Sequence, residues 1–146
     1  MPGLEDLYRE IILDHYKNPR NRGVLPPPAV RSEGHNPLCG DEIEVYLQVE
    51  NGVVSDVKIA GQGCSISQSS ASMMSAAVKG KPVDEVRSLV HRFKHMMSIE
   101  EETEPDMSIK LGDLEALQGV VKFPVRIKCA VLAWNTLAEG LEAATA

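Results

Sequence analysis

The chain has no run of 18 uncharged apolar residues, and its first residues lack the charged and then apolar start of a signal peptide. These absences argue against a membrane segment, and we expect a cytoplasmic protein. Clustered basic residues are also missing, because 15 Lys and Arg residues are dispersed among 21 Asp and Glu residues, giving a net charge of −6. Phosphate binding needs clustered cations, so nucleic acid is excluded as a partner, whereas a basic protein surface is not.

Cysteine is scarce, with three residues in 146, and none of them forms the paired C-x-x-C spacing of structural zinc modules. An odd number of cysteines in a reducing compartment cannot close a disulfide framework. Two interpretations stay open here: metal-binding or catalytic thiols, and three unrelated buried thiols. The length is that of one ordinary domain and no internal repeat divides it, so we expect a single domain over residues 1–146.

The hydrophobic period changes along the chain between the spacing of helices and that of strands. Alternation with a period of two over residues 41–59 predicts a hairpin, preceded by a short edge strand near Val30–His35. A Glu-rich stretch over 98–109 has no apolar period, which indicates a solvated loop, with an acidic docking patch as the alternative. Helical spacing predicts segments at Leu4–Tyr16, Ile66–Lys79, Val83–Met97, Leu114–Leu117 and from Pro124 onward, the last with Val131, Trp134, Leu137 and Leu141 along one face.

The apolar faces of the two hairpin strands predict their register. Matching these faces pairs Val49 with Val53 and Val45 with Val57, which requires a three-residue loop between the strands. A two-residue turn would set Leu47 against a charged residue, so we expect the longer loop.

Each cysteine lies at the boundary of a predicted element. Cys39 and Asp41 flank Gly40 just before the first long strand, and residues two apart in an extended chain project to the same side. Gly40 leaves room for an ion to approach, although a plain polar turn explains the same residues. Cys64 follows the hairpin at the start of a helix, where unpaired N–H groups and the helix dipole stabilise a thiolate. The alternative there is a buried cysteine beside serines that cap the helix.

Cys129 lies in the early turns of the last predicted helix, between Arg126 and Lys128. These cations favour the thiolate, although surface helices often carry basic residues without any such role. Together with Asp41, the three cysteines complete a tetrahedral shell for zinc. Carboxylate is a harder ligand than thiolate, so we expect Asp41 to be the first ligand displaced by incoming sulfur.

The histidines are weaker candidates for metal ligands. His35 is nearest to the cysteine motifs and is a reserve ligand. His91 and His95 are spaced i and i+4 on one predicted helix, but that helix lacks the Glu of the H-E-x-x-H motif, so a solvated or core-edge pair is the preferred interpretation.

Taken together, these motifs resemble the NifU/IscU/SufU family of iron-sulfur scaffold proteins over nearly the whole chain. The resemblance implies a SufE/NifU-like α+β fold, with a small antiparallel sheet of about three strands covered by several helices. It also implies that the cysteines and Asp41 bind a nascent iron-sulfur cluster or zinc, and that a cysteine desulfurase delivers persulfide sulfur to one thiol, with Cys129 as the candidate acceptor. The blocks that carry the resemblance are Ile12–Asn21 (ILDHYKNPRN), Asn36–Asp41 (NPLCGD), Gly61–Ser67 (GQGCSIS) and Phe123–Cys129 (FPVRIKC).

Two departures indicate the SufU branch of the family. IscU-type members carry a Leu-Pro-Pro-Val-Lys chaperone motif and a histidine directly before the third cysteine, whereas this chain has Lys-Phe-Pro-Val-Arg over 122–126 and Lys128. We therefore do not expect chaperone recruitment. The longer, Glu-rich stretch between the second and third cysteines also resembles that branch, which is similar to a zinc-dependent sulfur acceptor. In such a site Arg126 would orient Asp41.

Three functions remain open. The first is a cluster scaffold that passes clusters to recipient apo-proteins or carriers. The second is a zinc-dependent sulfurtransferase that holds no cluster, and the third is a zinc-stabilised interaction domain. Whether it is an enzyme therefore also stays open. The helix over Leu4–Tyr16 either docks the desulfurase or is an ordinary core helix.

Overall fold

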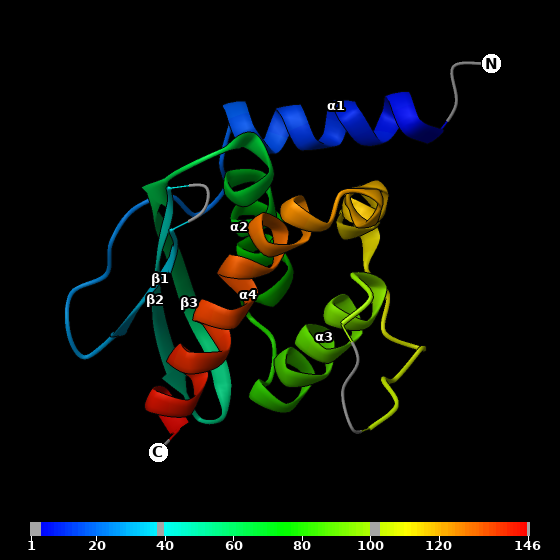
Figure 1. Ribbon diagram of the computed structural model, residues 1–146. Helices are drawn as coiled ribbons and strands as arrows, with labels where there is room; N and C mark the ends of the chain where they lie inside the picture. Colours follow the sequence, from blue (N-terminus) through cyan, green and yellow to red (C-terminus); the bar gives the residue numbers. More distant parts are fainter. Residues whose placement is uncertain (1–3, 38–39, 100–102, 146) are drawn as a thin grey trace.

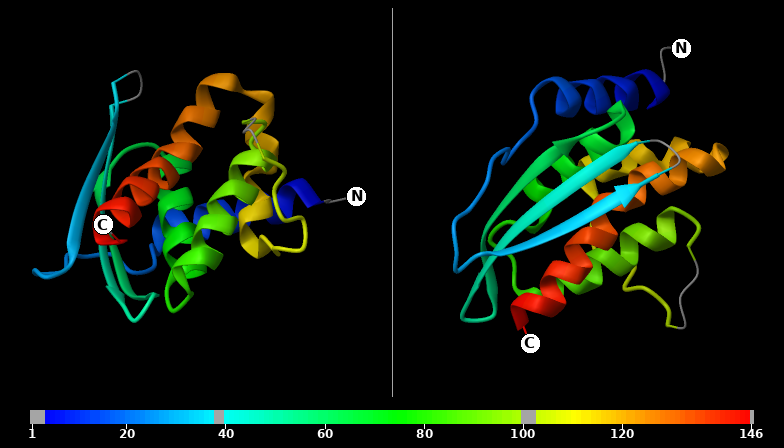
Figure 2. Two further views of the ribbon diagram at one scale, coloured as in Figure 1. Left: turned by 90° about the horizontal axis from the view of Figure 1, so that it is seen from below. Right: turned by 60° about the vertical axis from the view of Figure 1, so that its left-hand side comes forward.

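The fold combines a small antiparallel sheet with helices, as expected. The computed structural model describes residues 4–37, 40–99 and 103–145. Three strands in the order β1-β2-β3 form the sheet, and the helices pack on one side of it (Figures 1 and 2). The elements are α1 (Leu4–Lys17), β1 (Val30–Asn36), β2 (Asp41–Glu50), β3 (Val53–Gln62), α2 (Ser65–Val78), α3 (Val83–Met96), the 3₁₀ helix η1 (Gly112–Lys122) and α4 (Pro124–Thr145).

Most predicted elements are confirmed to within a residue or two. The edge strand near Val30–His35 is β1, which pairs with β2 alone within the described residues. The turn expected at 114–117 is one part of the longer helix η1. Residues 103–111 form neither helix nor strand, as predicted, although part of the Glu-rich stretch lies outside the described residues. None of the described helices is long and apolar enough to cross a membrane.

The predicted hairpin register is wrong. β2 and β3 are joined by the two-residue turn Asn51-Gly52, in which both residues have positive φ angles of 54° and 76°. This turn pairs Val49 with Val54, not with Val53. A bulge after Gln48 then shifts the register by one residue, so that Leu47 faces an apolar partner although the turn is short. The bulge places two residues between the buried Val54 and Val57, so the unbroken alternation assumed for the prediction gave the wrong loop length, and Val45 pairs with Ile59, not with Val57.

The core lies between the sheet and the helices α2 and α4. The predicted apolar face of α4 is buried, and Trp134 on this face stacks on Phe93 of α3 with ring centroids 4.3 Å apart. Helix α4 crosses β1 so closely that a Cβ on Gly34 would lie 2.0 Å from Thr136 Oγ1. This close approach fixes α4 against the sheet and places its first turns near the start of β2.

Candidate metal centre

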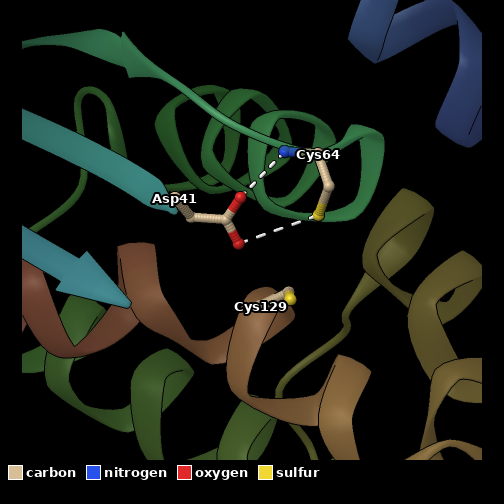
Figure 3. A group of neighbouring side chains, drawn as sticks. All are labelled: Asp41, Cys64 and Cys129. Carbon is tan, nitrogen blue, oxygen red and sulfur yellow. Dashed lines mark hydrogen bonds between the residues drawn. The ribbon is translucent and has the colours of Figure 1, made fainter. Parts of the chain in front are cut away.

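Three predicted ligands meet where β2, α2 and α4 begin. Asp41 is the first residue of β2, Cys64 caps the N-terminus of α2, and Cys129 lies in the second turn of α4. Their ligand atoms all lie within 4.8 Å of one another (Figure 3). Cys39, the fourth predicted ligand, lies outside the described residues. The structure therefore brings together three groups that are distant in the sequence.

The Asp41 carboxylate is fully buried, at 0% exposure, and is held by the second motif. Its Oδ1 accepts a hydrogen bond from the Cys64 backbone N–H at 2.8 Å, and its Oδ2 lies 3.8 Å from Cys64 Sγ. Gly63 makes this approach possible, because a Cβ there would lie 2.3 Å from Asp41 Oδ1 and 2.7 Å from Ser67 Oγ. The second glycine of Gly61-Gln62-Gly63 is thus needed for space beside the carboxylate.

Cys64 is itself the capping residue of α2. Its Sγ accepts a hydrogen bond from the Ser67 backbone N–H at 3.4 Å, and Ser67 Oγ donates to the Cys64 carbonyl oxygen at 3.1 Å. The predicted position at a helix N-terminus is confirmed, and a serine side chain does not replace Cys64 as the cap. The Ser67 N–H group therefore orients the Cys64 sulfur at the start of the helix.

Cys129 is buried at 0% exposure, and its Sγ lies 3.8 Å from the Val125 carbonyl oxygen. The flanking cations Arg126 and Lys128 are exposed. Within the described residues, Arg126 makes no ion pair with Asp41, whose carboxylate is oriented by the Cys64 amide. The orienting role of Arg126 stays a prediction.

The histidines lie apart from this centre. His35 is exposed on β1, and in the described part of the chain neither it nor His91 or His95 belongs to a group of three metal-ligating side chains. His15 is buried, with Nδ1 2.8 Å from Ser72 Oγ and Nε2 3.6 Å from Asp113 Oδ2. Burial lowers the pKa of His15, so the neutral ring joins α1 to α2 and η1.

The three groups fit zinc. Zinc-thiolate bonds of about 2.3 Å and zinc-carboxylate bonds of about 2.1 Å in a tetrahedron set neighbouring donor atoms about 3.6–3.8 Å apart. The Cys64 Sγ and Asp41 Oδ2 atoms already have this spacing, at 3.8 Å. Asp41 Oδ1 accepts the Cys64 N–H, and Oδ2 is the oxygen on the side of Cys64 Sγ. Asp41, Cys64 and Cys129 can therefore hold such an ion with small adjustments.

Sequence reasoning missed the residues that support this centre. Gly63 was not predicted to make room for the Asp41 carboxylate, and Ser67 was considered only as a cap. Gln68 and Arg22, which contact the Cys64 segment, were not identified. A serine three residues after an N-terminal cysteine is the one local signal that could have found Ser67.

The chain matches the family model described as "NifU-like N terminal domain" over residues 7–142. It is 51% identical over 138 residues to the zinc-dependent sulfurtransferase SufU of Bacillus subtilis, covering 94% of this chain and 91% of that protein. It is 42% identical over 136 residues to the iron-sulfur cluster assembly scaffold protein IscU of Thermotoga maritima, covering 93% of each. The crystal structure of a nitrogen-fixing NifU-like protein from Brucella abortus superposes with a TM-score of 0.82 at 26% identity, covering 97% of this chain and 96% of that one.

These matches define the class of protein: an iron-sulfur cluster assembly protein with the IscU/NifU-like α+β fold. The chain belongs to the NifU-like N-terminal domain family, and its likeness to SufU extends over nearly its full length. The family predicted from the cysteine motifs is confirmed.

Proposed function

We propose that this protein holds zinc at Cys39, Asp41, Cys64 and Cys129 and accepts persulfide sulfur there from a cysteine desulfurase. The observation that carries the proposal is the meeting of one buried carboxylate and two thiols at the starts of three elements. The similarity to a zinc-dependent sulfurtransferase supports zinc as the resident ion. When bound, zinc keeps the thiols deprotonated at neutral pH.

The transfer step is a thiol exchange. A thiolate of this chain attacks the outer sulfur of the desulfurase persulfide, a new sulfur-sulfur bond forms, and the desulfurase cysteine leaves as a thiolate. No net oxidation is needed, because the sulfane sulfur moves between two thiols. Cys129 is the acceptor predicted from the motifs, but of the two described cysteines Cys64 is half-buried and Cys129 is fully buried. Access therefore favours Cys64 over Cys129.

Asp41 is the ligand that we expect to open. Its carboxylate binds a soft ion less strongly than thiolate does, and its Oδ1 already has a second partner in the Cys64 amide. If the carboxylate left a bound ion, that hydrogen bond would keep it from becoming an unpaired buried charge. The site can thus open without exposing Asp41 to the full desolvation cost.

A cluster scaffold is the second candidate, because the same donors suit iron and the chain is similar to IscU over most of its length. In that case clusters built on the cysteines would pass to recipient apo-proteins or carriers. A zinc-stabilised interaction domain is the third reading, and it predicts that removing Asp41 lowers metal content and stability together and has no other effect.

One experiment separates these functions. The purified protein is incubated with its desulfurase and cysteine, and metal content and persulfide mass are then measured on each cysteine. Stoichiometric zinc with a persulfide supports sulfur transfer, and stoichiometric iron with acid-labile sulfide supports the scaffold. Bound zinc with neither persulfide nor cluster would refute both. Cys64→Ser and Cys129→Ser variants report which thiol receives the sulfur.

A further inference from the structure

The side chain of Arg22 contacts both ends of the segment that carries Cys64. The exposed guanidinium of Arg22 donates through Nη2 to the Gly61 carbonyl oxygen at 2.6 Å and through Nη1 to Gln68 Oε1 at 3.2 Å. Gly61 is three residues before Cys64, and Gln68 is four residues after it. Arg22 therefore spans the strand-to-helix junction with Cys64 at its centre.

The hydrogen bonds continue from Arg22 to the sulfur. Gln68 Nε2 donates to Ser67 Oγ at 3.4 Å, Ser67 Oγ donates to the Cys64 carbonyl oxygen at 3.1 Å, and the Ser67 N–H donates to Cys64 Sγ at 3.4 Å. Gln68 and Ser67 are both buried. The chain of contacts links an exposed cation to the thiol through side chains that have little room to move.

The backbone of Arg22 is anchored as well. Residues 21–23 add a short parallel bridge to the edge of β3, where the Gly23 N–H donates to the Ile59 carbonyl oxygen and the Ile59 N–H donates to the Asn21 carbonyl oxygen, each at 2.9 Å. In Figure 2 the chain after α1 is seen to run along this side of the sheet. The guanidinium thus extends from a fixed base.

We propose that Arg22 is a positioning residue for Cys64: its forked contact with Gly61 and Gln68 fixes the strand-to-helix junction that presents this thiol. The proposal rests on the proposed function, in which Asp41 opens. Gly61 has a φ of 121° and Gly63 lacks a Cβ, so the junction is intrinsically flexible. Arg22 restrains both ends of this junction from outside it, in addition to the Asp41 and Ser67 contacts that Cys64 makes directly. Planar guanidinium suits this role because its donors are in a fixed fork, whereas Lys offers one point charge.

The test measures alkylation of each thiol in the metal-free protein by mass spectrometry, with iodoacetamide as the probe. For Arg22→Gln we expect Cys64 to react roughly fivefold faster, because a charge-assisted hydrogen bond no longer restrains the junction, and Cys129 to react at the parent rate. Arg22→Lys should restore little of the protection. Arg87→Gln is the matched control, because Arg87 is also an exposed arginine whose guanidinium has partners, here Asp84 and Glu142 on α3 and α4.

A second readout is zinc affinity, measured with zinc alone in competition with a chromogenic chelator. We expect Arg22→Gln to weaken zinc binding roughly tenfold, at the low end of the effect of residues that support metal ligands. Gln68→Met should have a similar effect, and the double variant should show less than the sum of the two, because both residues act on one junction. Circular dichroism checks that each variant is folded.

Two results would overturn the proposal. One is equal Cys64 labelling in Arg22→Gln and Arg87→Gln, and the other is an equal rise at Cys64 and Cys129, which would mean general loosening. Neither result depends on zinc or sulfur transfer. Failure of the positioning role is therefore distinct from failure of the proposed function, which would appear as a parent protein that binds no metal and takes up no sulfur.

Discussion

Replacement of Gly63 by alanine should damage the site through space alone. The added Cβ would lie 2.3 Å from Asp41 Oδ1 and 2.7 Å from Ser67 Oγ, distances that real Cβ atoms do not adopt. The Asp41 carboxylate has to turn away, which breaks its 2.8 Å hydrogen bond from the Cys64 N–H. A lost hydrogen bond to a buried charge costs about 2 kcal/mol of unfolding free energy, because the carboxylate cannot reach water instead.

Gly119→Ala is the control for this variant. A Cβ at Gly119 would meet nothing within 4 Å, and neither glycine has the positive φ that strains other residues. For a chain of this length, about 2 kcal/mol lowers the melting temperature by roughly 4–8 °C. We expect that shift in Gly63→Ala and almost none in Gly119→Ala, both metal-free and measured by thermal unfolding.

Zinc affinity is the second measurement on this pair of variants. Displacement of one ligand and loss of its supporting hydrogen bond should weaken zinc binding at least tenfold in Gly63→Ala, as with other supporting contacts. If Gly63→Ala matched Gly119→Ala in both melting temperature and zinc affinity, Asp41 would not occupy the position described here, and the donor geometry built on it would be wrong.

Three further predictions concern the site and its support. Asp41→Asn keeps an acceptor for the Cys64 N–H but removes the anionic ligand, so zinc binding should weaken in competition with a chelator while the metal-free stability stays near that of the parent; unchanged zinc affinity would contradict Asp41 as a ligand. Burial lowers the pKa of His15 from its usual 6.5, so the unfolded chain binds this proton more readily and the free energy of unfolding falls as pH drops below 6.5. His15→Gln should remove part of this loss, measured by urea unfolding as the pH is lowered, and an unchanged pH dependence would count against it. Trp134 Nε1 donates to Ser70 Oγ at 3.1 Å, so Trp134→Phe should cost about 2 kcal/mol of unfolding free energy, measured by urea with circular dichroism, whereas a neutral result would rule out that contact as stabilising.

The helices and the strands were predictable because each depends on the residues of its own segment. Apolar spacing along α4 and alternation along β2 report which side faces the core, whatever the rest of the chain does. The hairpin turn was predicted wrongly because its register depends on contacts between two segments. Asn51-Gly52 is a strong local signal for a two-residue turn, and both residues adopt positive φ. The bulge after Gln48 lets this short turn keep apolar residues opposite each other, but the bulge depends on how the two strands pair.

The proposed ligands were predictable from their places at element boundaries, whereas the residues that support them were not. Asp41 and Cys64 are 23 residues apart, and their meeting follows once the hairpin returns β3 to the start of β2. Arg22 and Gln68 are 46 residues apart and meet because residues 21–23 lie on the edge of β3. No period or motif within either segment encodes that contact, so only the folded structure reveals it.

Buried serines of α2 explain why this helix can carry a reactive ligand at its start. Ser70 Oγ donates to the Ala130 carbonyl oxygen of α4 at 2.6 Å, Ser72 Oγ accepts from the Arg20 N–H at 2.8 Å, and Ser75 Oγ donates to the Arg20 carbonyl oxygen at 3.2 Å. Small hydroxyls let neighbouring segments approach closely while satisfying polar groups that would otherwise be costly to bury. Helix α2 is therefore fixed by directional bonds on two sides, and its N-terminal thiol does not depend on the metal for its position. In the proposed function, in which Asp41 opens, these hydrogen bonds of α2 would keep its first turn in position while the carboxylate moves.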